Sequence, residues 1–75
     1  MKRGERIYAY IQQESAAWPG DQVKGRIGFD AQQIANALDI LRNNVSKELN
    51  ALHRQGKIVK FSGRPVLYFD KACLE

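Results

Sequence analysis

The chain has 75 residues, 44% of them hydrophobic and 27% charged, with a formal net charge of +4 and an isoelectric point near 9.5. These values predict one globular domain over residues 1–75 with a small core, and they argue against a disordered chain. A single cysteine, Cys73, excludes an internal disulfide and a thiolate zinc site, and the sequence shows no signal peptide or transmembrane span. We therefore expect a cytoplasmic domain without a membrane partner, either complete or part of a longer protein.

Residues 2 to about 14 predict a first helix, because apolar side chains recur at helical spacing: Ile7, Tyr10 and Ile11, with Tyr8 on the flank. Gly4 weakens the start of this helix. We expect the helix to support the core. Its basic residues could also contact phosphate: Lys2, Arg3 and Arg6.

Residues 15 to 26 predict a loop, in which Trp18-Pro19-Gly20 is a turn signal because proline fixes φ and glycine permits positive φ. A loop of this length in so small a domain is often functional or ordered by its own side chains. We expect Trp18 to anchor the loop on the core rather than to bind a ligand. Ile27-Gly28-Phe29 then predicts a short strand before the next helix.

Residues 30–56 predict two helices joined by a tight turn, which is a helix-turn-helix. Asp30 can cap the first helix by accepting a backbone N–H bond, and Gln33 can complete a capping box. Apolar side chains then share one face: Ile34, Ala35 and Leu38. Asp39 lies where the chain reverses and tolerates left-handed backbone better than most residues, while Ile40 plugs the turn.

The second helix of this motif is expected at about residues 42–55, and Gly56 can end it in a left-handed conformation. A buried stripe repeats at helical spacing: Val45, Leu49 and Leu52. The opposite face carries side chains that donate to phosphates and contact base edges: Arg42, Asn43, Ser46, Lys47, Asn50 and Arg54. Such a face taken alone is typical of a solvated surface, and His53 is expected to be an ordinary surface residue. The tight turn before the helix and the basic hairpin after it favour nucleic acid.

Residues 57–70 predict a β-hairpin, because two runs rich in β-branched and aromatic residues flank Ser62-Gly63-Arg64-Pro65. Gly63 at the first central position suits a type II′ turn, and Pro65, which cannot donate a ladder hydrogen bond, should face outward at the tip. This register makes two cross-strand pairs: Val59 with Tyr68, and Phe61 with Val66.

The basic residues gather in the second half of the chain. Between Ile40 and Pro65 the only acidic residue is Glu48, whereas six residues are basic: Arg42, Lys47, Arg54, Lys57, Lys60 and Arg64. A localised positive charge predicts a polyanionic partner. Nucleic acid fits better than a membrane, because no basic amphipathic helix with a bulky aromatic face is visible.

The whole order of elements resembles the α+β winged helix-turn-helix domain of bacterial transcriptional regulators, in which a C-terminal β-hairpin forms the wing. The match is best from Ile27 to Asp70. More narrowly, Asn44-Val45-Ser46-Lys47-Glu48-Leu49-Asn50 and Gly63-Arg64-Pro65-Val66-Leu67-Tyr68 are similar to the N-terminal DNA-binding domain of sigma-54-dependent activators of the levanase-operon regulator type, which carry phosphotransferase-system regulation domains. This narrower resemblance implies a longer native protein, with an ATPase core and sugar-responsive domains downstream.

Two positions depart from the pattern of that family. It usually places Gly where this chain has Asp39, and Ser or Thr at the cap position held by Leu41. Leucine cannot cap a helix by hydrogen bonding, so the start of the recognition helix could shift by a residue or two, or Asp39 could serve as the cap.

These patterns predict sequence-specific binding of double-stranded DNA for transcriptional regulation, with the second helix of the motif in the major groove. We expect base contacts from Asn43, Ser46, Lys47 and Asn50, and a base or phosphate contact from Arg42. Phosphate contacts are expected from Arg54, Lys57, Lys60 and Arg64, with Arg64 at the wing tip near a minor groove. Because one such module buries only about 600–1,000 Å² on DNA, useful specificity would need a homodimer or further domains.

Other functions are compatible with parts of the sequence. A winged helix can serve protein–protein assembly without binding DNA, and the basic stripe argues against this. The Gly63-Arg64-Pro65 tip also resembles winged domains that bind left-handed Z-form duplexes, but the Asn and Tyr of their recognition helix are Ser46 and Asn50 here. We expect neither an enzyme nor a cofactor, because the chain has one His, one Cys, no paired carboxylates at useful spacing and no glycine-rich phosphate loop.

Overall fold

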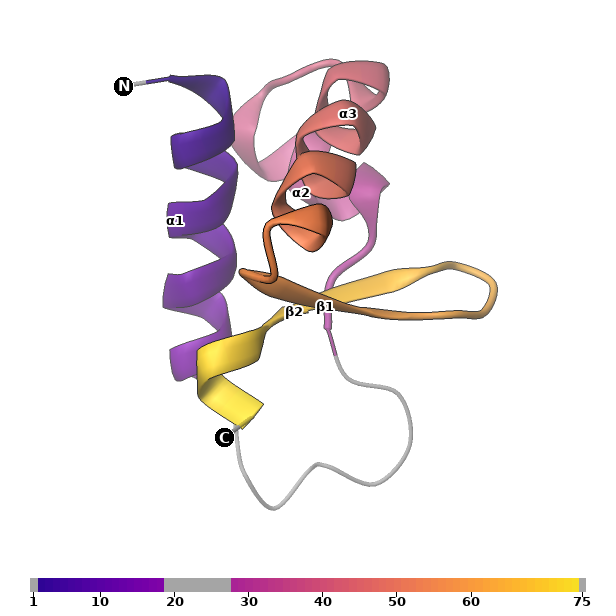
Figure 1. The fold of residues 1–75 in the computed structure, drawn as a ribbon. Helices are drawn as coiled ribbons and strands as arrows, with labels where there is room; N and C mark the ends of the chain where they lie inside the picture. Colours follow the sequence, from indigo (N-terminus) through magenta and orange to yellow (C-terminus); the bar gives the residue numbers. More distant parts are fainter. Residues whose placement is uncertain (1, 19–27, 75) are drawn as a thin grey trace.

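Helices and an antiparallel hairpin follow one another in the computed structural model, which describes residues 2–18 and 28–74 (Figure 1). The helices are α1 (Arg3–Ala16), α2 (Ala31–Leu38) and α3 (Arg42–Arg54). The strands are β1 (Ile58–Phe61) and β2 (Leu67–Asp70), and the short 3-10 helix η2 (Lys71–Leu74) follows. This layout is α+β and matches the predicted winged helix.

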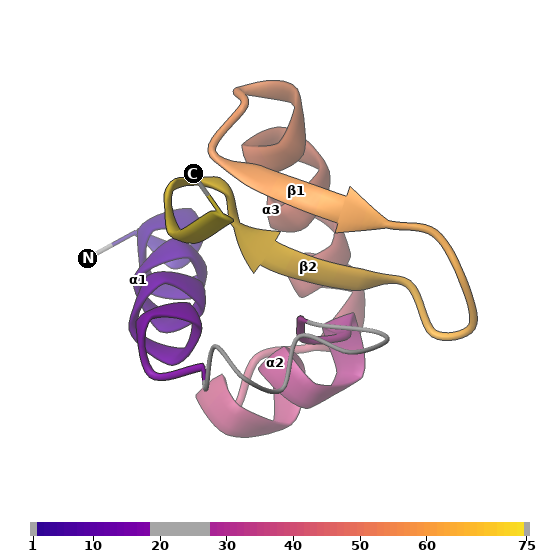
Figure 2. The ribbon, with the colours of Figure 1, turned by 90° about the horizontal axis from the view of Figure 1, so that it is seen from below.

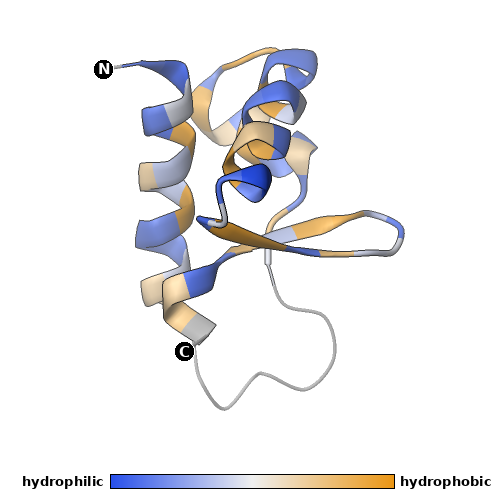
Figure 3. Ribbon diagram, viewed as in Figure 1, coloured by the Kyte–Doolittle hydropathy of each residue, from blue (hydrophilic) through white to orange (hydrophobic). Residues whose placement is uncertain are grey.

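The core lies between the three helices and the base of the hairpin. It includes Ile7 and Ile11 from α1, Ile34 from α2, Leu49 from α3 and Ile58 from β1, all of them nearly or fully buried. Figure 3 shows hydrophobic residues on the sides of the helices that face one another and hydrophilic residues on the outer sides. Seen from below, the hairpin crosses under α3 and its loop projects away from α1 (Figure 2).

The first helix is longer than predicted at its C-terminus. Ser15, which was expected in the loop, belongs to α1 and is buried. Its Oγ accepts a hydrogen bond from the backbone N–H of Asp70 over 3.1 Å, so a long-range partner holds the last turn of α1 against the end of β2. The sequence of the helix alone contains no sign of this contact.

Trp18, which was predicted to anchor the loop on the core, packs against the core directly after the end of α1. Its ring meets Phe29 edge-on at a centroid distance of 5.5 Å and Phe69 at 5.8 Å. Such edge-to-face pairs stabilise a core beyond the area that they bury. The predicted turn at Pro19-Gly20 and the rest of the predicted loop to residue 26 lie outside the described residues.

The strand predicted before α2 is present only as one isolated bridge, and Ile27 lies outside the described residues. Phe29 and Tyr68 exchange two backbone hydrogen bonds of 2.9 Å each. Gly28 is required beside this bridge, because its φ is 115° and a Cβ would come within 2.7 Å of the Tyr68 carbonyl oxygen. The bridge ties the start of α2 to the wing.

The turn between α2 and α3 follows the local signals. Asp30 Oδ1 accepts a hydrogen bond from the Gln33 N–H at 2.6 Å, and this is the only half of the predicted capping box that the structure shows. Asp39 has the predicted left-handed conformation, with φ 55° and ψ 49°. The N–H of Ile40 then donates to the Ala35 carbonyl over 3.0 Å, and the Ile40 side chain packs against the core.

Helix α3 begins directly after Leu41, which occupies the N-cap position without a side-chain hydrogen bond. The predicted alternative of a cap from Asp39 is not seen among the hydrogen bonds of the described residues. At the other end, Gly56 has a φ of 75°. The N–H of Gly56 donates to the His53 carbonyl and that of Lys57 to the Leu52 carbonyl, which together form a Schellman motif.

The hairpin register differs by one residue from the predicted one. The observed cross-strand pairs are Ile58 with Asp70, Val59 with Phe69, Lys60 with Tyr68, and Phe61 with Leu67. The predicted two-residue type II′ turn is wrong, because residues 62–66 all lie in the connection and Gly63 has a φ of 152°, far from the about +60° of that turn. Pro65 is exposed, as predicted.

Candidate nucleic-acid interface

The inner and outer faces of α3 are sharply separated. Val45 and Leu49 are fully buried, and Leu52 is nearly so. The polar residues that the sequence placed on the opposite face are exposed, except Ser46, which is half-buried: Arg42, Asn43, Ser46, Lys47, Asn50 and Arg54. The helix therefore presents donors to solvent along its whole length.

The wing and the first half of α3 border the same hollow. This hollow has a volume of about 260 Å³ and is lined by Arg42 and Ser46 of α3, by Pro65 and Val66 of the hairpin loop, and by the start of α2. The shared lining shows that the N-terminal half of α3 and the tip region of the wing lie on one side of the molecule. The concave surface between them is open to a ligand.

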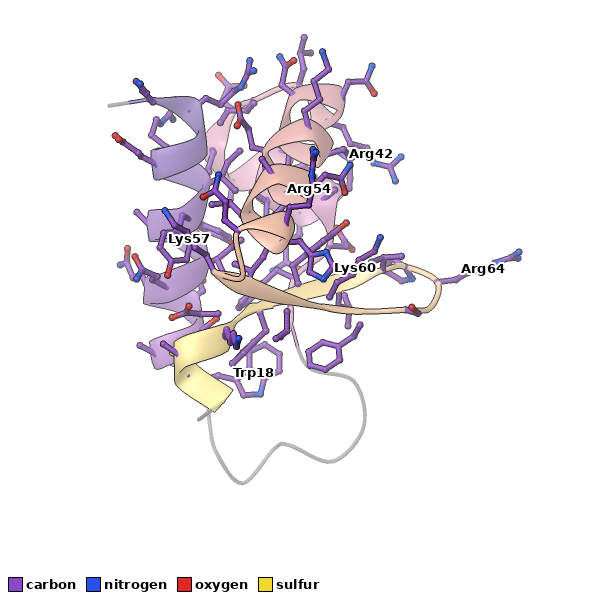
Figure 4. All side chains as sticks on the ribbon, in the orientation of Figure 1. Trp18, Arg42, Arg54, Lys57, Lys60 and Arg64 are labelled. Atoms are coloured by element: carbon purple, nitrogen blue, oxygen red, sulfur yellow. The ribbon has the colours of Figure 1, made fainter. Side chains whose placement is uncertain are left out.

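Four of the five labelled basic side chains lie on the side of α3 and the wing, and the fifth, Lys57, lies beside α1 (Figure 4). Arg42 and Arg64 extend away from α1, Arg54 lies in front of α3, and Lys60 follows the hairpin. All four residues are exposed. Their charges can therefore meet a polyanion without the cost of leaving the protein interior.

Two acidic groups near α3, Glu48 and Asp30, have partners of their own, whereas Asp39 is exposed at the turn before the helix. Glu48, on the side of α3 that faces α1, accepts a hydrogen bond from Arg3 at 2.9 Å in a salt bridge. Asp30 lines the hollow, but its Oδ1 caps α2. A negative charge at the N-terminus of a helix is also partly offset by the helix dipole.

Lys57 is the predicted phosphate contact that the structure sets apart from the others. Its Nζ lies 5.4 Å from the centroid of the Tyr8 ring, in a cation–π arrangement on the side of α1. Burial raises the pKa of Tyr8, and the Asp70 carboxylate raises it further, so the phenol stays neutral under Lys57. Lys57 is thus held beside α1 and apart from Arg64 at the wing tip (Figure 4).

The N-terminal arginines also have structural partners. Arg3 forms the salt bridge with Glu48, and Arg6 Nη2 donates to the Leu38 carbonyl over 3.1 Å. These contacts tie α1 to both helices of the motif. They position α3 and leave Arg3 and Arg6 less available for phosphate.

Sequence reasoning missed Leu41 as a functional candidate. It is 75% exposed at the N-terminus of α3, beside Arg42. The signal was present, since an apolar residue at a helix N-cap is unusual. In the sequence, leucine at the cap position suggested that the start of the helix could shift. In the structure, α3 begins directly after Leu41 without a side-chain cap.

Other kinds of site were also sought. No group of three or more His, Cys, Asp and Glu side chains in residues 2–18 and 28–74 is arranged to hold a metal ion. Within the same ranges, no helix has the length and hydropathy needed to cross a membrane.

Comparison with known proteins gives one informative similarity. Over 47 residues, or 63% of the chain, the sequence is 43% identical to the transcriptional regulatory protein DagR of Salmonella typhimurium (strain 14028s / SGSC 2262). The matched stretch is 5% of the length of that protein, so the chain is similar to a small part of it. No protein-family model matches the chain, and no solved structure matches it.

Proposed function

We propose that this chain is a DNA-binding domain of a transcriptional regulator and that it recognises double-stranded DNA by sequence. The observation that carries the proposal is the surface shared by α3 and the wing, where a hollow lined by Arg42 joins the two elements and further basic side chains are exposed on both of them. The similarity to DagR supports a regulatory role.

In this proposal α3 enters the major groove, which is wide enough to admit a helix. Asn43, Ser46, Lys47 and Asn50 contact base edges, because amide, hydroxyl and amino groups there can match the donor and acceptor pattern of each base pair. Arg42 lies at the end of α3 nearest the wing loop and contacts a guanine or a phosphate. The buried stripe on the other face of α3 fixes the direction of these side chains.

The wing supplies sequence-independent affinity. Lys60 and Arg64 neutralise phosphates on the flank of the groove, and Arg54 does so at the C-terminal end of α3. Arg64, at the exposed tip, is placed to approach a minor groove. Lys57 contributes least, because it lies over Tyr8.

The parent protein in this proposal is a longer sigma-54-dependent activator of the levanase-operon regulator type. The motif in α3 and the Gly63-Arg64-Pro65 tip support this finer assignment, and the short span matched in DagR agrees with a domain within a longer chain. The whole regulator, or a homodimer of it, would supply the specificity that one small module lacks.

The test is to select duplexes from a random-sequence pool with the 75-residue chain and to titrate the enriched duplex at increasing salt. Three phosphate contacts, from Arg54, Lys60 and Arg64, would give a slope of log K against log salt of about −2.7. The double variant Lys60→Ala and Arg64→Ala should reduce the slope by about 2. Lys71→Ala is the matched control, since Lys71 is exposed on η2, away from the wing tip (Figure 1).

Two results would contradict the proposal. One is that no sequence is enriched from the pool. The other is that binding does not depend on salt, or that Lys71→Ala changes the salt slope as much as the double variant Lys60→Ala and Arg64→Ala does. Either result would favour a winged helix that serves protein–protein assembly.

A further inference from the structure

Leu41 is the one large hydrophobic side chain that is exposed in residues 2–18 and 28–73. Three quarters of its surface is open to solvent, whereas the neighbouring Ile40 packs against the core. Single exposed apolar residues are common on protein surfaces, so exposure alone carries no argument. The position of Leu41 is what distinguishes it.

Leu41 does not stabilise α3 in the way that residues at a helix N-cap usually do. At the N-cap of α3 a Ser, Thr, Asp or Asn would accept a hydrogen bond from the first turn, and Leu41 makes no such bond. Its carbonyl accepts bonds from the N–H groups of Asn44 and Val45, which any residue could do. Local stability therefore gives no reason for leucine at this position.

The surroundings of Leu41 are polar. It borders a hollow of about 400 Å³ between α2 and α3 whose other exposed lining residues are all polar or charged: Gln32, Asn36, Asp39 and Arg42. The remaining lining residues, Ala35 and Ile40, pack against the core. Gln32 and Asn36 hydrogen-bond to each other over 3.0 Å, which leaves Leu41 as the exposed apolar group at this end of the recognition helix. In the helix-turn-helix geometry, the N-terminal end of that helix is the part that meets base edges.

We propose that Leu41 is a specificity-determining residue that contacts the C5-methyl group of a thymine in the major groove. This inference rests on the proposed function. The thymine methyl is the apolar group that the base pairs present in that groove, and it is read by apolar side chains. Arg42 and the polar residues after it read donors and acceptors, and Leu41 adds the apolar contact that they cannot make.

The test uses the duplex enriched from the random pool and replaces each thymine in turn with deoxyuridine, which lacks only the methyl group. Affinities for the 75-residue chain and for Leu41→Ala are measured by fluorescence anisotropy. At one thymine, or at a symmetry-related pair, removal of the methyl should weaken binding of the original chain about fourfold, the loss expected for one methyl-sized apolar group. The same replacement should leave the affinity of Leu41→Ala unchanged.

A second variant separates recognition from folding. Leu41→Ser supplies the missing cap, so its thermal midpoint should rise while its response to the thymine methyl is lost. The inference is overturned if the original chain responds to the methyl of no thymine, or if both variants respond as the original chain does. If no duplex is enriched, the proposed function fails first and this inference fails with it.

Discussion

The inner and outer faces of α3 come from the same 13 residues but have opposite properties. The inner face is buried against α1, α2 and the wing, and its side chains are aliphatic. The outer face is polar and basic, and it shares a concave surface with the wing. The inner face therefore determines whether the domain folds, and in the proposed function the outer face determines what it binds. Substitutions on the two faces should have separable effects.

The largest expected effect is on the inner face. Leu49→Ala removes a fully buried side chain and should lower the free energy of unfolding by about 2–5 kcal/mol. A domain of this size has only about 4–11 kcal/mol in total, so the variant should be close to unfolding at physiological temperature. Urea unfolding followed by circular dichroism measures the difference.

Lys47→Ala is the matched control for Leu49→Ala, two residues away on the exposed side. It should change the free energy of unfolding by no more than about 0.5 kcal/mol. A comparable loss from Lys47→Ala would mean that the outer face also holds the fold together, and the separation of the faces would be lost.

The next effect concerns the bridge that holds the wing. Gly28→Ala forces a Cβ against the Tyr68 carbonyl at a φ of 115°, and the free energy of unfolding should fall by about 1–3 kcal/mol. Gly56→Ala is the comparison, because Gly56 also has positive φ but a Cβ there would meet nothing within 4 Å. If Gly56→Ala costs as much as Gly28→Ala, backbone strain alone explains both losses and the contact with Tyr68 contributes nothing.

The helix-turn-helix was predictable because its signals are local. The cap by Asp30 and the left-handed turn at Asp39 depend on residues within one turn of the chain, and so does the stop at Gly56. The buried stripe of α3 follows from helical spacing alone. The exposed faces of the helices follow from the same spacing, so the exposure of most residues in the candidate interface was predictable as well.

The wing register and the end of α1 were not predictable in this way. The register depends on the length of the hairpin loop, and both faces of the hairpin carry apolar residues, so alternation could not select one pairing. Ser15 joins α1 because Asp70, 55 residues away, donates to it. Lys57 lies beside α1, apart from the wing tip, because its ammonium group sits over the ring of Tyr8. Each of these outcomes depends on a partner distant in sequence.

Effects on DNA binding should appear on the outer face without loss of stability. Lys47→Ala should weaken binding to the selected duplex by about 1–3 kcal/mol and relax sequence preference, because Lys47 is assigned to a base edge. Lys60→Ala should weaken binding to all duplexes alike, because Lys60 is assigned to a phosphate. It should also reduce the slope of log K against log salt by about 1. Competition with scrambled duplexes measures both effects.

Lys57→Ala is the matched control for Lys60→Ala, since both lysines are exposed and they lie three residues apart. Its effect on the salt slope should be smaller, because Lys57 is held over the Tyr8 ring. Equal salt slopes for the two variants would show that Lys57 leaves Tyr8 to reach the DNA.

The roles of Lys47 and Lys60 are tested by comparing their two variants directly. Equal loss of sequence preference from Lys47→Ala and Lys60→Ala would refute the assignment of Lys47 to a base edge and Lys60 to a phosphate.

The smallest effect is expected at the turn that joins the two helices of the motif. Asp39 is exposed, has φ 55° and ψ 49°, and its side chain makes no hydrogen bond that the described residues show. Asp39→Gly removes the steric cost of the left-handed conformation but adds freedom to the unfolded chain, so the free energy of unfolding should rise by less than about 1 kcal/mol. Asp39→Asn tolerates the same backbone and removes only the charge, so it separates strain from electrostatics. If Asp39→Gly is less stable than the original chain while Asp39→Asn is not, the polar side chain stabilises the turn, and the fold rather than the binding surface requires it there.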